Sequence, residues 1–134
     1  MKVRIIAKDK YEIASIIAKD SCCVELFFAE LDKSFNSNIA DLIVMMEHIA
    51  THGFSNIPRG WSHEIDKQEK IFELIKGRLR IPYFHGEGDR IIVCGPGFMK
   101  QKQTTSDSVK KGMKKLRDQY FKDLAAGKLG TLGQ

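Results

Sequence analysis

The chain has 134 residues, of which 43% are hydrophobic, and its net charge is +5. This length and hydrophobic content predict one domain with a core that needs neither disulfides nor a metal ion for support. Cys22, Cys23 and Cys94 are odd in number and show no CxxC spacing, which argues against a disulfide framework and a zinc site. The sequence shows no signal-peptide pattern and no run of about 20 apolar residues. We therefore expect a cytoplasmic protein without membrane association.

The pentapeptide IIAKD occurs twice near the start of the chain, at residues 5–9 and 16–20. These copies indicate either two strands joined near Tyr11, or one strand followed by an ambiguous segment. Apolar residues at helical spacing then predict a first helix that is capped by Ser21 and ends near Lys33.

A second helix is predicted to begin at Asn38, where an asparagine side chain can cap the first turn, and to end at Gly53. Residues 54–69 contain proline and glycine breakers and few apolar residues, so they are expected to form a connecting loop. Trp61 or Ile65 could anchor that loop to the core.

Short apolar runs separated by turn residues predict three consecutive antiparallel strands, at residues 71–75, 78–84 and 90–94. Pro82 has no N–H to donate, so the middle strand should lie at an edge or be irregular at this point. The Gly-Pro-Gly sequence at residues 95–97 predicts a kink or bulge directly after the third strand.

The last predicted element is a helix from Ser106 to Gly127, whose apolar stripe should pack through Met113, Leu116 and Tyr120. We interpret residues 1–127 as a single domain and residues 128–134 as a flexible tail. Taken together, the elements predict an α+β fold. Two N-terminal helices would cover a mostly antiparallel, twisted sheet, and a basic C-terminal helix would follow it.

Positive charge is concentrated in the last quarter of the chain. Residues 100–134 hold nine Lys or Arg against three Asp or Glu, whereas residues 1–99 hold 13 against 14. Such a segment suggests an anionic partner such as nucleic acid, an acidic protein or a membrane surface. If the partner is a nucleic acid, Lys110, Lys111 and Lys114 of the last helix are candidate RNA contacts. A solvated, lysine-rich helix face is the alternative interpretation.

A second group of cations is predicted on the sheet. Strand alternation places Arg78 and Arg80 on one face, and Lys100 and Lys102 share a face if the chain continues as a strand beyond the kink. Four converging cations repel one another unless an anion such as a phosphate backbone lies among them. The alternative is that they lie on separate, solvated faces. His85, at the end of the middle strand, is a candidate proton acceptor near such a cleft.

Three motifs then become informative together: FEL at residues 72–74, Arg80 and Tyr83 within RIPYF, and GFMKQKQTTSDSVKKGMKKL at residues 97–116. In this order, and with the predicted elements, they resemble the HigB-like branch of the RelE/ParE toxin superfamily. The last motif is similar to that family's phenylalanine, lysine pair, threonine and final helix. The resemblance is strongest over residues 71–120.

Members of this superfamily are typically ribosome-dependent messenger-RNA endonucleases, neutralised by an antitoxin that often carries a helix-turn-helix domain. The resemblance therefore implies the toxin of a type II toxin–antitoxin system that cleaves messenger RNA without a metal ion or other cofactor. Fixed cations stabilise the charge that develops on the phosphate in such a reaction, a role for which Arg78, Arg80, Lys100 and Lys102 are candidates. Crowding by other cations disfavours an ammonium group, so either lysine is also a candidate for proton transfer.

Glu73 and His85 are further candidates for proton transfer, and Tyr83 is a candidate for stacking on a base. The residue types do not decide which group is the base and which the acid. Two alternatives to an endonuclease stay open: a gyrase poison, as in the ParE-like sister branch, and a degenerate toxin that only binds. Ile75 favours the binding module, because the family commonly has an arginine there, after Glu73 and Leu74.

Overall fold

A β-hairpin precedes the first helix in the computed structural model, which describes residues 1–133. β1 (Lys2–Lys8) and β2 (Glu12–Ala18) pair antiparallel, so the first interpretation of the two IIAKD copies, as two strands, is confirmed. β1 is a strand because its apolar residues alternate: Val3 and Ile5 are buried on one face, and a bulge between Ile5 and Ala7 turns Ala7 into the cluster on the other face.

The two helices predicted in the first half of the chain are present, although they follow the hairpin. α1 (Cys23–Glu30) begins after a two-residue strand, β3 (Ser21–Cys22), and its N-cap residue makes no side-chain hydrogen bond. A short 3-10 turn, η1 (Lys33–Phe35), leads into α2 (Asn36–His52). α2 ends at Gly53, whose positive φ of 70° suits glycine, as the sequence predicted.

The predicted loop at residues 54–69 contains two elements that the sequence did not indicate: η2 (Arg59–Trp61) and β4 (Ser62–Asp66). β4 pairs antiparallel with the next strand and lies at one end of the sheet. A strand at the end of a sheet has a neighbouring strand on one side only, so polar residues are tolerated there. Three strands follow in the predicted places: β5 (Ile71–Lys76), β6 (Leu79–Phe84) and β7 (Arg90–Cys94).

The kink predicted at Gly95–Gly97 is present and explains how Pro82 fits inside the sheet. The partner of β6 is interrupted here: β7 pairs with one part of β6, and β8 (Phe98–Met99) pairs with the other. Gly95 N donates a 2.9 Å hydrogen bond to Pro82 O within this break. Because N and O of a strand residue point the same way, the missing donor of Pro82 faces the interruption.

The predicted fold class is wrong in two respects. The sheet is mixed rather than mostly antiparallel, and helices pack on both of its faces. Residues 1–133 form a nine-stranded mixed sheet, in which seven strands run in the order β4-β5-β6-β7-β2-β1-β9, with β3 beside β2 and β8 beside β6. β2 pairs with β7, and β1 with β9, in parallel. Local patterns cannot reveal such pairings, because the paired segments are far apart in the sequence.

The last helix, α3 (Asp107–Ala125), is capped by Ser106, whose side chain accepts a hydrogen bond from Val109 N. It packs as predicted: Met113 and Tyr120 are buried, and Leu116 lies against the same cluster. The predicted flexible tail is partly a strand, because β9 (Gly130–Leu132) pairs with β1. Gln134, the last residue of that prediction, lies outside the described residues.

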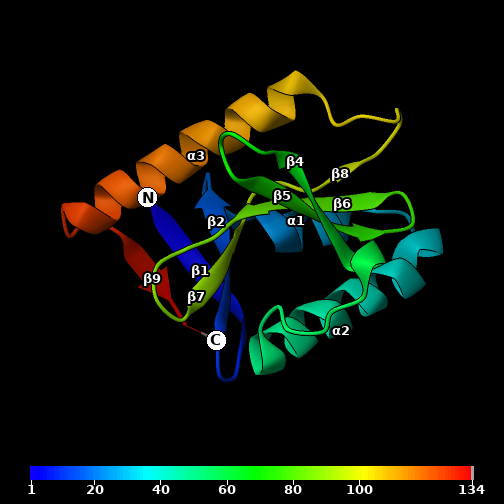
Figure 1. The fold of residues 1–134 in the computed structure, drawn as a ribbon, viewed down its shortest axis with the longest axis horizontal. Helices are drawn as coiled ribbons and strands as arrows, with labels where there is room; N and C mark the ends of the chain where they lie inside the picture. Colours follow the sequence, from blue (N-terminus) through cyan, green and yellow to red (C-terminus); the bar gives the residue numbers. More distant parts are fainter. Residues whose placement is uncertain (134) are drawn as a thin grey trace.

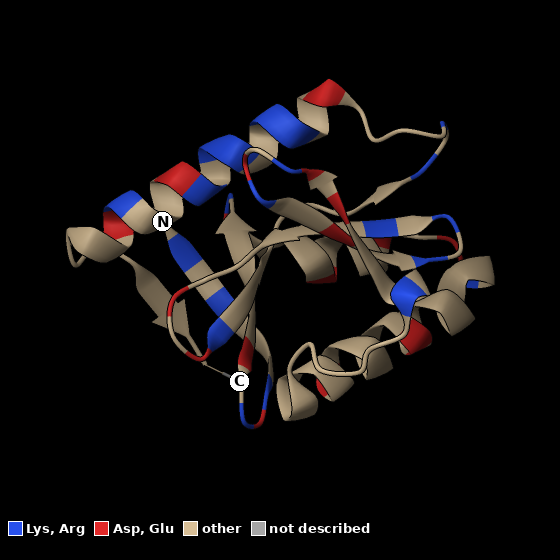
Figure 2. Ribbon diagram, viewed as in Figure 1, with Lys and Arg blue, Asp and Glu red and all other residues tan. Residues whose placement is uncertain are grey.

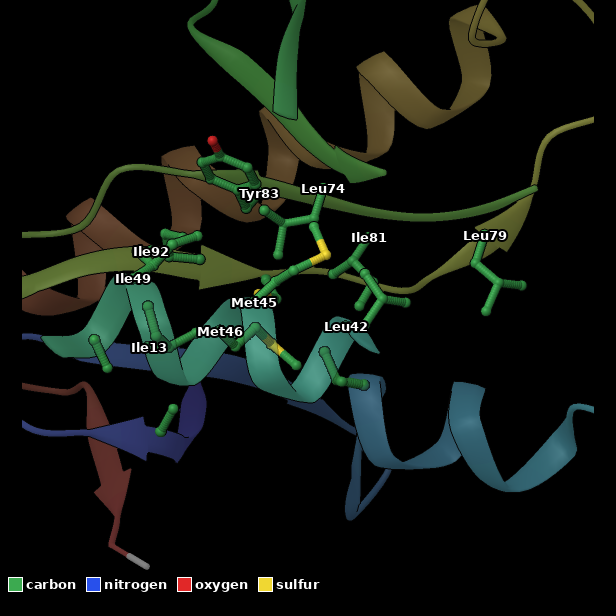
Figure 3. Packing of buried hydrophobic residues seen from close by; sticks show 14 of the residues in the cluster. Ile13, Leu42, Met45, Met46, Ile49, Leu74, Leu79, Ile81, Tyr83 and Ile92 are labelled. Atoms are coloured by element: carbon green, nitrogen blue, oxygen red, sulfur yellow. The ribbon is translucent and has the colours of Figure 1, made fainter. Parts of the chain in front are cut away.

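Helices cover both faces of the sheet (Figure 1). On one face, Leu74 and Ile81 from the strands pack against Met45 and Met46 of α2, with α1 beside it (Figure 3). On the other face, α3 covers a second cluster that includes Phe84. Along β5 and β6 the two faces alternate residue by residue, which decides where each candidate side chain lies. None of the helices in residues 1–133 has the length and apolar character needed to cross a bilayer.

Candidate functional site

Glu73 is at the centre of the site because it is a buried carboxylate on β5, a strand whose other buried residues, Ile71 and Leu74, are apolar. It is fully buried, between Phe72 and Leu74 in the sequence, and it faces the side of the sheet that α3 covers. A buried carboxylate is costly unless it is paired with cations and hydrogen-bonded. The partners of Glu73 therefore identify which side chains the fold brings together.

Three nitrogen atoms lie near one oxygen of this carboxylate. Arg80 Nε is 3.3 Å from Glu73 Oε2, Lys100 Nζ is 3.6 Å from it, and His63 Nε2 is 3.4 Å from it. Within residues 1–133, neither Oε2 nor Arg80 Nε has a hydrogen bond of normal geometry, so the contacts of Arg80 and Lys100 are ionic, and that of His63 is ionic only when the imidazole is protonated. One carboxylate cannot neutralise two permanent cations, so a positive charge remains for an anionic ligand.

Arg80 is positioned by β6 and by the turn before it. Its Nη1 donates hydrogen bonds to Gly77 O at 2.7 Å and to Leu79 O at 3.0 Å, and its side chain is 13% exposed. Gly77 needs its positive φ of 55° in this turn, and a Cβ there would lie 2.5 Å from the Asn38 side chain. The turn that holds the Arg80 guanidinium thus depends on a glycine.

Lys100 is positioned by the loop between β8 and α3. Its backbone N–H donates to Arg78 O at 2.8 Å, and its side chain is 14% exposed. The other end of the loop is fixed by Thr105, whose buried hydroxyl donates a 2.9 Å hydrogen bond to Glu73 Oε1. The two oxygens of Glu73 therefore have different functions: one faces the cations, and the other holds the loop.

The strand predicted to carry both lysines ends at Met99, which corrects the expected geometry. Lys102 lies in the loop and is exposed, and Arg78 is an exposed turn residue rather than part of β6. Lys100 and Lys102 nevertheless line one hollow of about 450 Å³, together with Thr105. The four predicted cations thus separate into two pairs: Arg80 and Lys100 lie beside Glu73, whereas Arg78 and Lys102, close to them in the sequence, are exposed.

Tyr83 and His85 lie on the opposite face of the sheet from Glu73. Tyr83 pairs with Phe72 across the strands, is 2% exposed, and its hydroxyl is 2.6 Å from Ser62 Oγ. Burial raises the pKa of Tyr83 to about 12. Its ring already stacks on those of Phe54 and Phe72, so stacking of Tyr83 on a base, which stays a prediction, would require these contacts to be replaced.

His85 is exposed, but it does not join the cation cluster. Its Nδ1 is 2.9 Å from Ile91 O, and its ring contacts the rings of Phe54, Phe72 and Tyr83. The prediction of a proton acceptor beside the cations is therefore not met by His85, which the alternation of β6 places with Tyr83 on the other face.

The basic residues of α3 form a separate surface. Lys111 and Lys114 are exposed and Lys110 is half-buried. Lys114 Nζ is 2.9 Å from Asp118 Oδ2, so part of its charge is paired. Figure 2 shows basic bands along α3 with acidic bands between them, and basic segments on the loop that joins β8 to α3.

His63 and Thr105 are two residues of the site that were not among the predicted site residues. His63 lies opposite Glu73 in the β4–β5 ladder, within the segment that was predicted to be a loop. Residues 62–66 contain one apolar residue, Ile65, so no apolar alternation marked this segment as a strand. Within residues 1–133, no group of three or more His, Cys, Asp or Glu side chains is arranged to hold a metal ion.

No model of a known protein family matches this chain, and no curated protein matches it with significance.

Proposed function

We propose that this protein is the toxin of a type II toxin–antitoxin system and that it cleaves messenger RNA on the ribosome without a metal ion. The observation that carries the proposal is the pair of cations, Arg80 and Lys100, held beside the buried carboxylate of Glu73. Fixed cations at the point where phosphate charge develops are what such a reaction requires. The motif resemblance over residues 71–120 supports the same assignment.

In this proposal the role of each residue follows from how exposed its side chain is. Arg80 and Lys100 contact the scissile phosphate, and Glu73 orients them from behind, since its buried carboxylate cannot reach a substrate. Lys102 and Arg78, which are exposed, contact neighbouring phosphates of the message. The ribosome supplies the orientation of the RNA, which lowers the entropic cost of reaching the reactive geometry.

The exposed lysines of α3 give the protein a further basic surface. Lys111 and Lys114 are suited to contact ribosomal RNA or an acidic antitoxin, because both partners are anionic. The partner that neutralises the toxin is, by the resemblance, an antitoxin with a helix-turn-helix domain.

A translating extract with a defined message tests this function. Purified protein should produce new RNA ends in the message when ribosomes are present and none when they are omitted. Arg80→Ala should abolish the cuts, whereas Arg59→Ala, a change at an exposed arginine of η2, should not. Pre-isolated ribosome complexes that are exchanged into buffer without free divalent metal should still be cut.

One observation favours a non-catalytic binding module as the second candidate. Ile75 pairs across the strands with Arg80, so an apolar side chain lies next to the cation where the toxin family commonly has another arginine. Intact RNA in the extract would favour this module. Intact RNA together with inhibited DNA supercoiling by gyrase would instead favour the ParE-like activity.

A further inference from the structure

His63 and Glu73 form a pair that differs from the other contacts of the site. They lie directly opposite each other in the β4–β5 ladder, and His63 Nε2 is 3.4 Å from Glu73 Oε2. The carboxylate is fully buried, whereas 46% of the histidine side chain is exposed. One partner is therefore fixed in the interior and the other reaches the surface.

This contact determines which nitrogen of His63 can act as a base. An ionised carboxylate repels the free electron pair of a neutral imidazole. The proton of a neutral His63 therefore lies on Nε2, the nitrogen that faces Glu73, although the 3.4 Å contact is not a hydrogen bond of normal geometry. Nδ1 then carries the free electron pair. A carboxylate behind the ring also stabilises the imidazolium that forms when Nδ1 takes up a proton.

The surroundings of His63 place this base beside a phosphate site. Arg80 from β6 and Lys100 from the loop after β8 face the same carboxylate oxygen as His63, at 3.3 and 3.6 Å. A phosphate bound by these two cations would lie within reach of the imidazole. β4 is the end strand of the sheet order found for residues 1–133, so RNA can approach His63 from the open edge.

We propose that His63 is the general base of the reaction, positioned by Glu73; this inference rests on the proposed RNA cleavage. The 2′-hydroxyl gives its proton to Nδ1 while its oxygen attacks the adjacent phosphorus. The P–O5′ bond breaks, and the 5′-oxygen leaves with the electron pair of that bond and takes a proton from water. The products are a 2′,3′-cyclic phosphate and a 5′-hydroxyl, and His63 then returns its proton to the solvent.

Other groups of the chain fit this role less well. Glu73 is buried behind the cations, and His85 lies on the other face of the sheet, with Nδ1 already 2.9 Å from Ile91 O. His48 and His52 lie on α2, away from the cations beside Glu73, and their rings contact each other at 4.6 Å. His63 is the histidine that combines exposure with a contact to Glu73.

The test uses ribosomes stalled on a defined message and the full chain. His63→Gln and His63→Ala should lower the cleavage rate by about 10²- to 10⁴-fold, the usual contribution of a general base. Added imidazole should restore part of the rate in His63→Ala, where the deleted ring leaves room, and should not restore Lys100→Ala. His52→Gln, at an exposed histidine of α2, should cut at the wild-type rate.

A measurement of binding to the ribosome complex distinguishes a general base from a residue that only supports the structure. A message with a 2′-deoxy nucleotide at the cut site cannot be cleaved, and both His63 variants should bind its ribosome complex as the wild type does. Wild-type cleavage by His63→Gln, failure of imidazole to restore His63→Ala, or loss of binding in both variants would overturn the inference and leave the proposed function standing. If the wild type itself makes no cut, both proposals fail.

Discussion

Thr105 and Glu73 are joined by a 2.9 Å hydrogen bond although 32 residues separate them in the sequence. The bond lies in the interior and ties the loop after β8 to the middle of β5. Lys100 belongs to the same loop, so this contact also limits how far its ammonium group can move from the carboxylate. A single buried hydroxyl thus helps to maintain the arrangement of charges.

Replacement of Thr105 by valine keeps the volume of the side chain and removes the hydroxyl. The variant should lose about 1–3 kcal/mol of unfolding free energy, because Glu73 Oε1 is left buried without its donor. Urea denaturation measures this loss, and RNA cleavage should fall as the loop loosens. Thr104→Val, at the exposed neighbouring position, is the control and should change neither quantity.

Glu73→Gln tests whether the carboxylate holds the cations together. The amide has the same shape but no charge, so Arg80 and Lys100 would face each other without a counterion. We expect a loss of about 3–5 kcal/mol in unfolding free energy, as is typical when one partner of a buried ion pair is removed. Glu64→Gln, on the exposed part of β4, should have little effect, and equal stability of the two variants would contradict the ionic role.

The two lysines of the loop should differ in their effect on activity. Lys100→Met removes a cation that lies 3.6 Å from Glu73 and should lower RNA cleavage by about 10²-fold or more. Lys102→Met removes an exposed cation and should mainly weaken binding in a salt-dependent way. Measurements of the rate at saturating and at low concentrations of ribosome complex separate these effects. A larger loss of the saturated rate with Lys102→Met would contradict the arrangement.

Tyr83 should make the stability of the protein sensitive to alkaline pH. Burial raises its pKa from an ordinary value of 10.0 to about 12, so the folded state holds the phenolic proton more strongly than the unfolded state does. Its contribution is complete below pH 10 and is lost as the pH rises toward about 12. Urea denaturation between pH 8 and 12, expressed relative to the value at pH 8, should show a smaller decline for Tyr83→Phe. Equal declines in both proteins would contradict this prediction.

Gly95 allows α3 to approach the sheet closely. A Cβ at this position would lie 2.3 Å from Met113 Sδ, so Gly95→Ala should force the end of the buried Met113 side chain to repack and cost about 1–3 kcal/mol. Gly112→Ala is the matched control in α3, because a Cβ there meets nothing within 4 Å, and it should stabilise the helix by up to about 1 kcal/mol. Thermal denaturation of the two variants should therefore shift the midpoint in opposite directions.

The sequence predicted those elements whose signal is local. β5, β6 and β7 are short apolar runs separated by turn residues, and α3 has a regular apolar stripe, so their places were found. The convergence of Arg80 and Lys100 was also expected, but through a strand that does not exist beyond Met99. Lys100 instead reaches the site because the chain kinks at residues 95–97.

The remaining parts of the fold depend on contacts between distant segments. β4 and β9 are short and carry few apolar residues. Each becomes a strand only because it pairs with the edge of a neighbouring strand. The parallel pairing of β2 with β7 has no local signature either. His63 was missed for this reason: its importance follows from its position opposite Glu73, which the sequence alone did not reveal.

The packing of α3 has a consequence for the order in which the chain can fold during its synthesis. The face of β1 and β2 that carries Val3 and Ile16 is covered by a helix that begins only at Asp107. The ribosome synthesises the chain from its N-terminus, so the hairpin of β1 and β2 emerges long before α3. Until α3 has been made, the hairpin keeps an apolar surface exposed. The hydrophobic cluster on the face that α2 covers includes residues of β7 but none of α3, so it can form before α3 has been made. We therefore expect a half-covered sheet as the species most prone to aggregate, and to recruit chaperones, during translation.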